Sequence, residues 1–282
     1  MKLITTRYQE KVIVMAKYKL VPTPGSKVSL KKYDPEFVGS YDKESARAEV
    51  DDLRGKLSEL QERLYAEGKQ SLLVVFQAMD TGGKDGAIEK VFGGINPAGV
   101  QVTSFKVPSA LELAHDFLWR IHQHTPSKGY IGVFNRSHYE DVLVVRVNKL
   151  VPDSVWQKRY EHINHFEHLL ADNGTRILKF YLHISKDEQK KRMLDRLRQP
   201  DKNWKFSKGD LPVRERWDDY MSAYEDAISN CNTSYAPWHI VPANNKWYRD
   251  LMVAKTIVKT LEDMNPTYPS PEEGLDEVVI PD

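Results

Sequence analysis

The sequence predicts an α/β fold in which a parallel β-sheet lies between two layers of helices. Short runs of apolar, often β-branched residues, such as residues 72–76, recur along the chain and are typical of strands buried on both faces of a parallel sheet. Segments with apolar residues at helical spacing separate these runs, and such alternation indicates right-handed β-α-β units. The sequence has no internal repeat and no change in composition that would divide it into two domains.

The composition is that of an ordinary globular protein with a sizeable core. Of 282 residues, 40% are apolar and 29% are charged, and the formal net charge is +1. Any anion must therefore be bound by a local cluster of cations. The single cysteine, Cys231, excludes an internal disulfide framework and fits a reducing compartment. No apolar run approaches the roughly 20 residues of a membrane span, and the N-terminus has no small-residue cleavage site. We expect a cytoplasmic protein without a membrane partner, whose translation starts at Met1 or Met15.

The N-terminal third is predicted to hold an arm, a long helix and the first strand. Residues 1–40 are polar and contain three prolines, which predicts an extended arm. Apolar residues then recur at steps of three and four, between Asp42, which can cap a helix, and Gly68, which can end one. This stripe could be a coiled-coil seam between subunits. It is shorter than about four heptads, however, which favours packing on the sheet.

The remaining elements follow from the same signals. Further strands are predicted at residues 100–107, 129–134, 176–184 and 238–241, which gives five in all. Helices are predicted at residues 109–126, 152–171, 185–199, 214–229 and 246–263. Capping boxes at Ser109 and Ser185 begin two of them. Residues 142–147 fit a strand or a helix, because propensity does not decide between them. Residues 265–282 have four prolines and five acidic residues and are expected to form a loosely held tail.

In a parallel sheet ligands bind beyond the carboxyl ends of the strands, so the residues there are candidates for function. Residues 80–86 form a glycine-rich turn after the first strand, and the turn ends in Lys84 before a helix. This is the layout of a P-loop, in which backbone N–H groups and a lysine bind phosphate. Two positions depart from the standard pattern: its first glycine is Ala78, and its Ser or Thr is Asp85. Asp80 offers a carboxylate for magnesium instead. The alternative is a surface turn with an exposed lysine.

A second polar group, residues 135–141, follows the third strand. Arg136 suits bidentate contact with phosphate. Glu140 and Asp141 could position a metal ion or a nucleophile. The alternative is a surface turn with local ion pairs.

A third group, residues 186–208, follows the fourth strand and holds nine basic residues against four acidic ones. Arg192 and Arg196 are four apart and share a helix face. The segment could be a solvated basic face, a nucleic-acid site, or a lid over a polyanion and the transferring phosphoryl group. Nucleic acid is disfavoured, because there is no base-stacking motif and the domain as a whole is not basic.

Together these groups resemble the polyphosphate kinase 2 family, and within it the class that acts on both AMP and ADP (class III). The resemblance covers about residues 41–262. Its motifs, in order, are QAMDTGGKDG (77–86), FNRSHYEDVLVVRV (134–147), KFYLHISKDEQKKR (179–192), DKNWKF (201–206), YAPW (235–238) and VPANNKWYR (241–249). Any one of these motifs is weak evidence, but the full ordered set is highly specific.

The resemblance implies a P-loop kinase fold, with a five-stranded parallel sheet in three α/β/α layers and a basic helical lid at about residues 190–212. The kinase domain would span residues 41–264. Members of the family transfer the terminal phosphoryl group of inorganic polyphosphate reversibly to nucleotides. For this class the acceptors are AMP and ADP, which become ADP and ATP. The family also implies Mg²⁺, with Mn²⁺ as a possible substitute, and a homo-oligomer, either a dimer or a tetramer.

The resemblance also implies roles for particular residues. Asp80 corresponds to the magnesium ligand of the loop and Lys84 to its phosphate-binding lysine. Asn135 stands where other classes carry a Walker-B aspartate, which favours acceptance of AMP. That departure leaves the second metal ligand open between Glu140 and Asp141, with Glu140 preferred. The expected catalytic residues are Asp80, Lys84, Arg136, Glu140 and Arg192. The expected nucleotide and phosphate contacts are Gly82, Gly83, Lys84, Asp85, Gly86, Asn135, Arg136 and Asp141. The expected polyphosphate contacts on the lid are Arg192, Arg196, Lys202, Lys205 and Lys208.

Two other functions remain compatible with a P-loop. One is a nucleotide kinase that uses ATP as its phosphate donor. The other is a non-catalytic module that binds a nucleotide and regulates a partner protein.

Overall fold

The computed structural model describes residues 20–281, and its centre is a five-stranded sheet in which all neighbouring strands are parallel. In spatial order the strands are β2 (Val100–Ser104), β3 (Ile131–Asn135), β1 (Ser71–Gln77), β4 (Thr175–His183) and β5 (Trp238–Pro242). The prediction of five parallel strands is confirmed. The choice between Met1 and Met15 lies outside the described residues.

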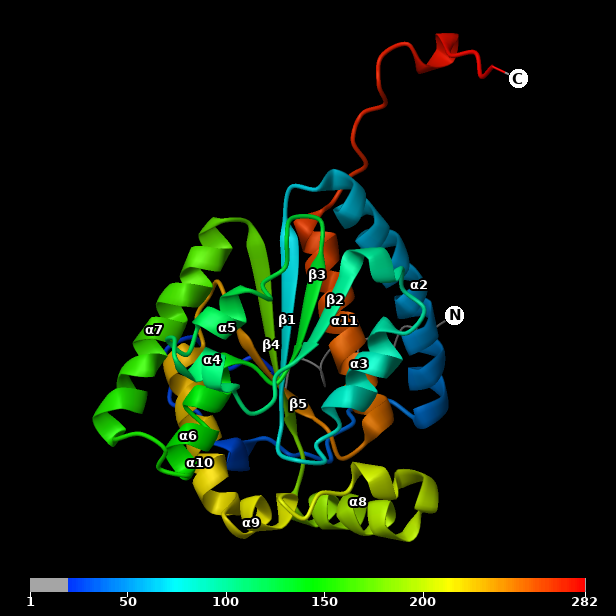
Figure 1. The fold of residues 1–282 in the computed structure, drawn as a ribbon. Coiled ribbons are helices and arrows are strands. Elements are labelled where there is room, and N and C mark those ends of the chain that lie inside the picture. The colour runs from blue at the N-terminus through cyan, green and yellow to red at the C-terminus, as the bar shows by residue number, and fades with distance from the viewer. Residues whose placement is uncertain (1–19, 282) are drawn as a thin grey trace.

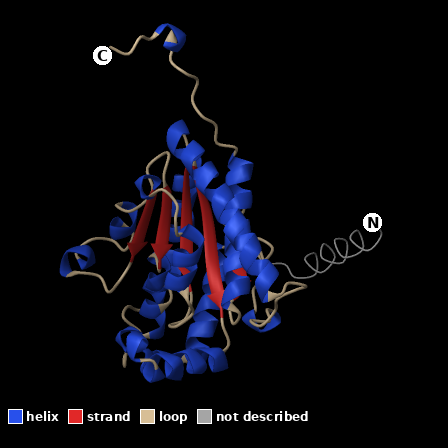
Figure 2. Cartoon of the chain, turned by 90° about the vertical axis from the view of Figure 1, so that its right-hand side faces the viewer, coloured by secondary structure: helices blue, strands red, loops and turns tan. Residues whose placement is uncertain are grey.

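Helices cover both faces of this sheet and make three layers (Figures 1 and 2). On one face lie α2 (Lys43–Glu67), α3 (Lys84–Phe92) and α11 (Lys246–Met264). On the other lie α7 (Asp153–Asp172) and α10 (Trp217–Cys231), with the short helices α4 (Ala110–Leu113), α5 (Trp119–His122) and α6 (Val144–Val147). None of the helices in the described part of the chain is long and apolar enough to cross a membrane.

The central strand β1 is buried along its whole length. Phe76 stacks on Phe180 of β4, with ring centroids 5.4 Å apart. Fully burying a side chain of this size stabilises the fold by about 1.5–3 kcal/mol. The chain leaves β1 toward β2 on one side and later reaches β4 on the other. This places the ends of β1, β3 and β4 around one crevice, where ligands of such sheets bind.

Helix α2 begins and ends where the sequence predicts. The side chain of Asp42 accepts hydrogen bonds from the backbone N–H groups of Glu44 and Ser45, and Gly68 ends the helix with φ of 62°. The C-terminal half of the apolar stripe belongs to the main core that includes the strands. The N-terminal half packs on Leu251 of α11. The stripe is therefore buried within its own chain, and packing on the sheet accounts for only half of it.

The helix predicted at residues 109–126 is wrong, because two short helices, α4 and α5, stand in its place. The capping box at Ser109 is present. The side chain of Asp116 then accepts hydrogen bonds from the backbone N–H groups of Leu118 and Trp119, and this turn interrupts the helix. At Ser185 only half of the predicted capping box forms, because the carboxylate of Glu188 accepts from Arg192 instead. Of the ambiguous residues 142–147, residues 144–147 form helix α6 and residues 142–143 form a turn.

The third group of the sequence lies across the carboxyl ends of the strands, at the bottom of Figure 1. It comprises α8 (Lys186–Arg198) and the 3-10 helix η4 (Pro200–Lys205), and α9 (Asp210–Glu215) follows it. We call residues 190–212 the lid segment.

The two ends of the described chain differ in their packing. The described part of the arm, residues 20–40, is attached to the body, since Val28 and Leu30 are buried and the carbonyl of Leu20 accepts from the N–H of Ile240 at 2.8 Å. The C-terminal residues 266–281 run away from the body (Figures 1 and 2) and include the 3-10 turn η5 (Leu275–Glu277).

Candidate active site

The glycine-rich loop between β1 and α3 directs its carbonyl groups into the protein. All six carbonyls from Ala78 to Gly83 accept hydrogen bonds. Their donors, in order, are Lys84 Nζ (2.9 Å), the N–H of Gly82 (2.9 Å), Gln189 Nε2 (3.0 Å), Arg192 Nη1 for both Thr81 and Gly82 (3.1 Å each), and Arg249 Nη1 (3.1 Å). The loop is therefore held from behind by side chains of α8 and α11.

This orientation leaves backbone N–H groups at the mouth of the loop. The N–H groups of Lys84, Asp85 and Gly86 belong to the first turn of α3, which has no acceptors within its own helix. A helix N-terminus that follows a loop of this kind binds anions, because the N–H groups and the helix dipole both favour negative charge. The predicted phosphate-binding loop therefore has the required geometry.

Gly83 is essential to this geometry. Its φ of 97° is unfavourable for other residues, and a Cβ added there would collide with the guanidinium of Arg249. We expect Gly83→Ala to weaken the binding of tripolyphosphate, measured by calorimetry, by about 10-fold or more, because backbone strain costs about 1–3 kcal/mol. Gly68→Ala is the matched control: Gly68 has a φ of 62° and no heavy atom within 4 Å of an added Cβ. Equal affinities in the two variants would contradict the prediction.

Lys84 lies buried at the start of α3, with its Nζ on the carbonyl of Ala78. Burial, and then the positive charge of Arg136, lowers the pKa of Lys84 to about 8, although Asp80, Glu140 and Asp85 oppose the shift. Its ammonium group thus donates to a carbonyl rather than to a carboxylate, and it can turn to a phosphate oxygen without breaking an ion pair.

Arg136 joins the first and second polar groups. Its Nη2 lies 2.7 Å from Asp80 Oδ1, and its Nη1 lies 3.3 Å from Glu140 Oε2. Glu140 and Asp80 both raise the pKa of Arg136. The other oxygen of Glu140 accepts from Gln77 Nε2 at 3.0 Å. The structure therefore brings together Asp80, Arg136 and Glu140, as predicted, from the ends of two adjacent strands.

The two departures from the standard P-loop pattern turn out to be partners. Asn135 Nδ2 donates to Asp85 Oδ1 at 2.6 Å. A carboxylate stands where a hydroxyl is usual, and an amide stands where a carboxylate is usual. The two positions are hydrogen-bonded to each other, and the pair carries one negative charge, as the usual hydroxyl and carboxylate would.

The donor set at the loop fits a magnesium ion that is shared with a substrate. Asp80 and Glu140 lie on either side of Arg136, and Asp210 of α9 lies nearby. Burial and the negative charge of Asp80 raise the pKa of Asp210. Within residues 20–281, no group of three or more His, Cys, Asp or Glu side chains is arranged to hold a metal ion. Magnesium commonly uses one or two carboxylates and takes its other ligands from water and substrate phosphates, so two carboxylates suffice.

Arg192 is placed differently from its predicted role. It is 6% exposed, and its donors are all engaged. Nε donates to Glu188, and the four terminal N–H groups reach the carbonyls of Thr81, Gly82, Ala243 and Asn244. In this arrangement Arg192 supports the loop, and its contact with polyphosphate stays a prediction.

The other lid cations lie on the surface. Arg196 Nη1 donates to the carbonyl of Lys205 at 2.8 Å and lies 3.8 Å from Asp210. Lys202, Lys205 and Lys208 are exposed. Such a surface can follow a long polyanion with few demands on sequence.

Asp141 is not brought to the cluster around Arg136. Its side chain accepts from Arg159 of α7 at 2.8 Å. Burial raises the pKa of Asp141 to about 6, although Arg159 opposes the shift. Its nucleotide contact stays a prediction.

Four residues of the site were missing from the sequence prediction: Gln77, Gln189, Asp210 and Arg249. Arg249 ends the motif at residues 241–249, so the motif could have suggested it. Gln189 lies within the motif at residues 179–192, but its contact with the carbonyl of Asp80, which lies 109 positions away in the chain, has no local signal.

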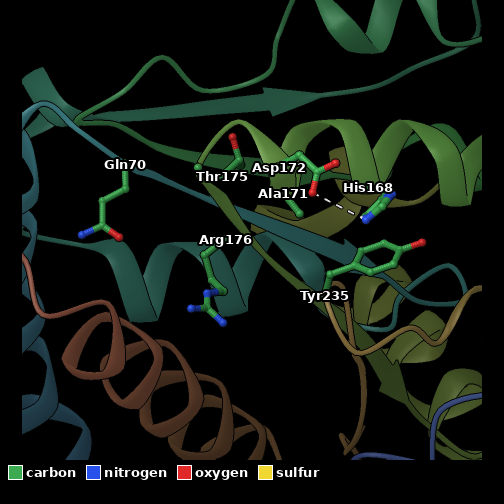
Figure 3. A pocket seen from close by; sticks show the side chains of 8 residues that line it. Gln70, His168, Ala171, Asp172, Thr175, Arg176 and Tyr235 are labelled. Atoms are coloured by element: carbon green, nitrogen blue, oxygen red, sulfur yellow. Dashed lines mark ion pairs between the residues drawn. The ribbon is translucent and has the colours of Figure 1, made fainter.

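A hollow of about 330 Å³ lies at the opposite end of the sheet, beside the amino ends of β1 and β4 (Figure 3). It is lined by Gln70, His168, Ala171, Asp172, Gly174, Thr175, Arg176 and Tyr235. Its ion pair, His168 with Asp172 at 3.5 Å, is exposed, and exposed pairs contribute little. The carboxyl end of the sheet remains the candidate active site.

Comparison with known proteins finds a family model, relatives and a solved structure that match most of this chain. Residues 40–269 match the family model described as polyphosphate kinase 2. The chain is similar to an AMP/ADP-polyphosphate phosphotransferase of Meiothermus ruber, with 53% identity over 94% of this chain and 100% of that protein. It is 48% identical to an ADP-polyphosphate phosphotransferase of Rhodopseudomonas palustris, over 87% of this chain and 89% of the relative. The crystal structure of polyphosphate kinase 2 from Arthrobacter aurescens TC1 superposes with a TM-score of 0.88 at 44% identity, covering 92% and 93% of the two chains.

Proposed function

The chain belongs to the polyphosphate kinase 2 family, and we propose that it transfers the terminal phosphoryl group of inorganic polyphosphate to AMP and ADP, giving ADP and ATP reversibly. The observation that carries this proposal is the cluster at the loop. Unpaired N–H groups of α3, Lys84 and Arg136 surround one place where a phosphate can sit, with the carboxylates of Asp80 and Glu140 beside it.

The reaction needs no nucleophile from the protein. An oxygen of the terminal phosphate of AMP or ADP attacks the last phosphorus of polyphosphate and forms a new P–O bond. The P–O bond to the rest of the polymer breaks, and the polymer leaves one unit shorter. The attacking oxygen is already ionised, so no general base is required. Catalysis then consists of positioning and charge stabilisation.

The residues of the site divide these tasks. Lys84 and the N–H groups of α3 bind phosphate oxygens and stabilise the charge that develops on them. The guanidinium of Arg136 has a fixed orientation, since its Nη2 is held by Asp80 and its Nη1 by Glu140. It can present its N–H groups to a phosphate in that orientation. Gln189, Arg192 and Arg249 hold the loop in place.

We propose Mg²⁺ as the cofactor, with Mn²⁺ as a substitute, held by Asp80 and by Glu140. When bound, the ion neutralises negative charge on the phosphates. The half-buried Arg196 and the exposed Lys202, Lys205 and Lys208 of the lid segment are proposed to bind the polymer beyond its reacting end. A homo-oligomeric state and a cytoplasmic location remain part of this proposal.

The proposal is tested with purified protein, magnesium and polyphosphate. It requires formation of ADP from AMP and of ATP from ADP, and the absence of both products would refute it. Supplying ATP and AMP without polyphosphate tests for an ordinary nucleotide kinase. Initial rates are compared, because the reaction is reversible. A regulatory module would bind nucleotide in both assays without moving phosphate.

The pairing of Asn135 with Asp85 predicts an effect on the choice of acceptor. Asn135→Asp adds a second carboxylate beside Asp85 and repels the acceptor phosphate. AMP offers a single phosphate for binding, so we expect the ratio of AMP to ADP turnover to fall about 10-fold, the size of a coupling of roughly 1.4 kcal/mol.

The control for this variant exchanges the two residues, Asp85→Asn with Asn135→Asp, and so restores one amide and one carboxylate. The AMP to ADP ratio should then return toward that of the wild type. A ratio that is unchanged in the single variant would show that the added charge does not govern acceptor choice.

A further inference from the structure

A buried polar cluster includes the first two residues of the 3-10 helix η3 (His138–Asp141), the turn that also carries Glu140. We define it as His138, Tyr139, Glu167 of α7 and Lys179 of β4. All four side chains are completely buried. None of them has a role in the mechanism above. Charged groups are rarely buried unless they are paired, so a cluster of this kind needs an explanation.

The hydrogen bonds of this cluster are specific in direction. Lys179 Nζ donates to Tyr139 Oη (2.8 Å), to Glu167 Oε2 (2.5 Å) and to the carbonyl of Cys231 (2.6 Å), which uses all three of its protons. The hydroxyl of Tyr139 donates in turn to Glu167 Oε1 at 2.9 Å. The His138 ring nitrogen Nε2 lies 3.2 Å from the same oxygen. Burial alone raises the pKa of Glu167, but Lys179 and His138 outweigh it and the pKa of Glu167 is lowered, so its carboxylate stays ionised.

The cluster is connected to the active site through a short, strained piece of backbone. Arg136 has a φ of 63°, in the left-handed region that a non-glycine residue adopts only when its surroundings fix it. On one side its N–H donates to the carbonyl of Phe76 at 3.0 Å. On the other side Ser137 accepts from the N–H groups of Tyr139 and Glu140, at its side chain and its carbonyl respectively. These bonds connect Tyr139 to the backbone of Arg136 and Glu140 through Ser137.

We propose that the buried cluster, acting through the hydroxyl of Tyr139, positions Arg136 and Glu140 for phosphoryl transfer. This inference rests on the proposed function. Tyr139, Glu167 and Lys179 are positioning residues, since they reach the reacting groups only through η3. An apolar cluster could stabilise this region equally well, because buried ion pairs often do not add stability over apolar packing. It could not fix the rotation of the Tyr139 side chain about its bonds, which the directed hydrogen bonds do.

Tyr139→Phe is the informative variant, because it removes one oxygen atom and leaves the Lys179–Glu167 ion pair intact. The ring still packs on Trp238, with centroids 4.7 Å apart, so the protein should fold. We expect kcat for ADP to fall about 10-fold, as small displacements of reacting groups do, with KM for ADP and polyphosphate changed by less than about 2-fold. A rise in KM without a fall in kcat would overturn the proposal.

Tyr235→Phe is the matched control. It also removes a hydroxyl that is bonded to α7, in this case to the carbonyl of Asn164 at 3.1 Å. Tyr235 lies at the end of the sheet opposite the candidate active site, beside His168 (Figure 3). We expect kcat of this variant to equal that of the wild type. Equal losses of kcat in the two variants would mean that only general stability is at work.

A mutant cycle distinguishes positioning from an independent structural role. In a background that carries both Arg136→Ala and Glu140→Gln, the two positioned groups are already absent, so adding Tyr139→Phe should lower the residual rate by less than about 2-fold. Independent effects would instead multiply, and a further 10-fold loss in this background would overturn the proposal.

Hydrogen exchange measured by mass spectrometry tests the positioning without any need for activity. Amides of residues 136–143 should exchange faster in Tyr139→Phe than in the wild type. In Tyr235→Phe these amides should exchange at the rate of the wild type. If the wild type transfers no phosphate but exchange is still faster in Tyr139→Phe than in the wild type, the proposed function fails. The role of the cluster in holding η3 then still stands. Unchanged exchange in Tyr139→Phe overturns the positioning role itself.

Discussion

Replacing Lys84 with methionine is expected to lower turnover from polyphosphate to ADP at least ~100-fold, the scale of losing one electrostatic stabiliser from an active site. Methionine keeps the length and the apolar stem of lysine but carries no charge. The site of Lys84 is buried and already disfavours its charge, lowering its pKa to about 8. A neutral side chain should therefore be accepted without loss of folding, and the thermal midpoint should not fall. Initial rates at saturating polyphosphate and ADP provide the measurement.

The control for this variant is Lys90→Met on the same helix. Lys90 is exposed and pairs with Asp51 at 3.2 Å, so its loss should leave turnover unchanged.

The pH dependence of tripolyphosphate binding gives a second check on Lys84. Lys84 is charged below its pKa of about 8 and neutral above it, so the affinity of the free protein for tripolyphosphate should fall as pH rises through 8. Lys84→Met should show no such step. A variant that retains full turnover would exclude Lys84 from the mechanism.

Asp80→Asn is expected to have the second large effect, also at least ~100-fold on turnover. The amide keeps the shape of the carboxylate and an oxygen that can accept from Arg136, which now lies 2.7 Å away. What it loses is the negative charge that would hold the proposed magnesium ion. We therefore expect the magnesium concentration for half-maximal rate to rise as well.

Glu140→Gln is the comparison that assigns the second ligand. A similar rise in the magnesium requirement would place Glu140 on the metal. A lower rate at an unchanged magnesium requirement would mean that Glu140 acts only by orienting Arg136. If Asp80→Asn itself kept the magnesium dependence of the wild type, the proposed metal site would have to be abandoned.

Much of the fold follows from local patterns in the sequence. The continuous apolar run of β1 predicts a strand buried on both faces, and every residue of that strand is buried. The ends of α2 are recognisable because Asp42 and Gly68 satisfy the free backbone groups of a helix locally. Where two local signals compete, the prediction is weaker. At residues 109–126 helical spacing suggests one helix, but Asp116 bonds its own neighbouring N–H groups and interrupts it.

The sequence by itself determined the strands, the long helices, the loop around Lys84 and the basic segment after β4, because each depends on neighbours in the chain. The tertiary structure alone decided the partners of the site residues. Asn135 meets Asp85, Arg192 is engaged by the loop and by the carbonyls before α11, and Asp141 turns to Arg159. These contacts join segments from different strand ends, and their energies depend on distance and burial, which exist only once the sheet has assembled.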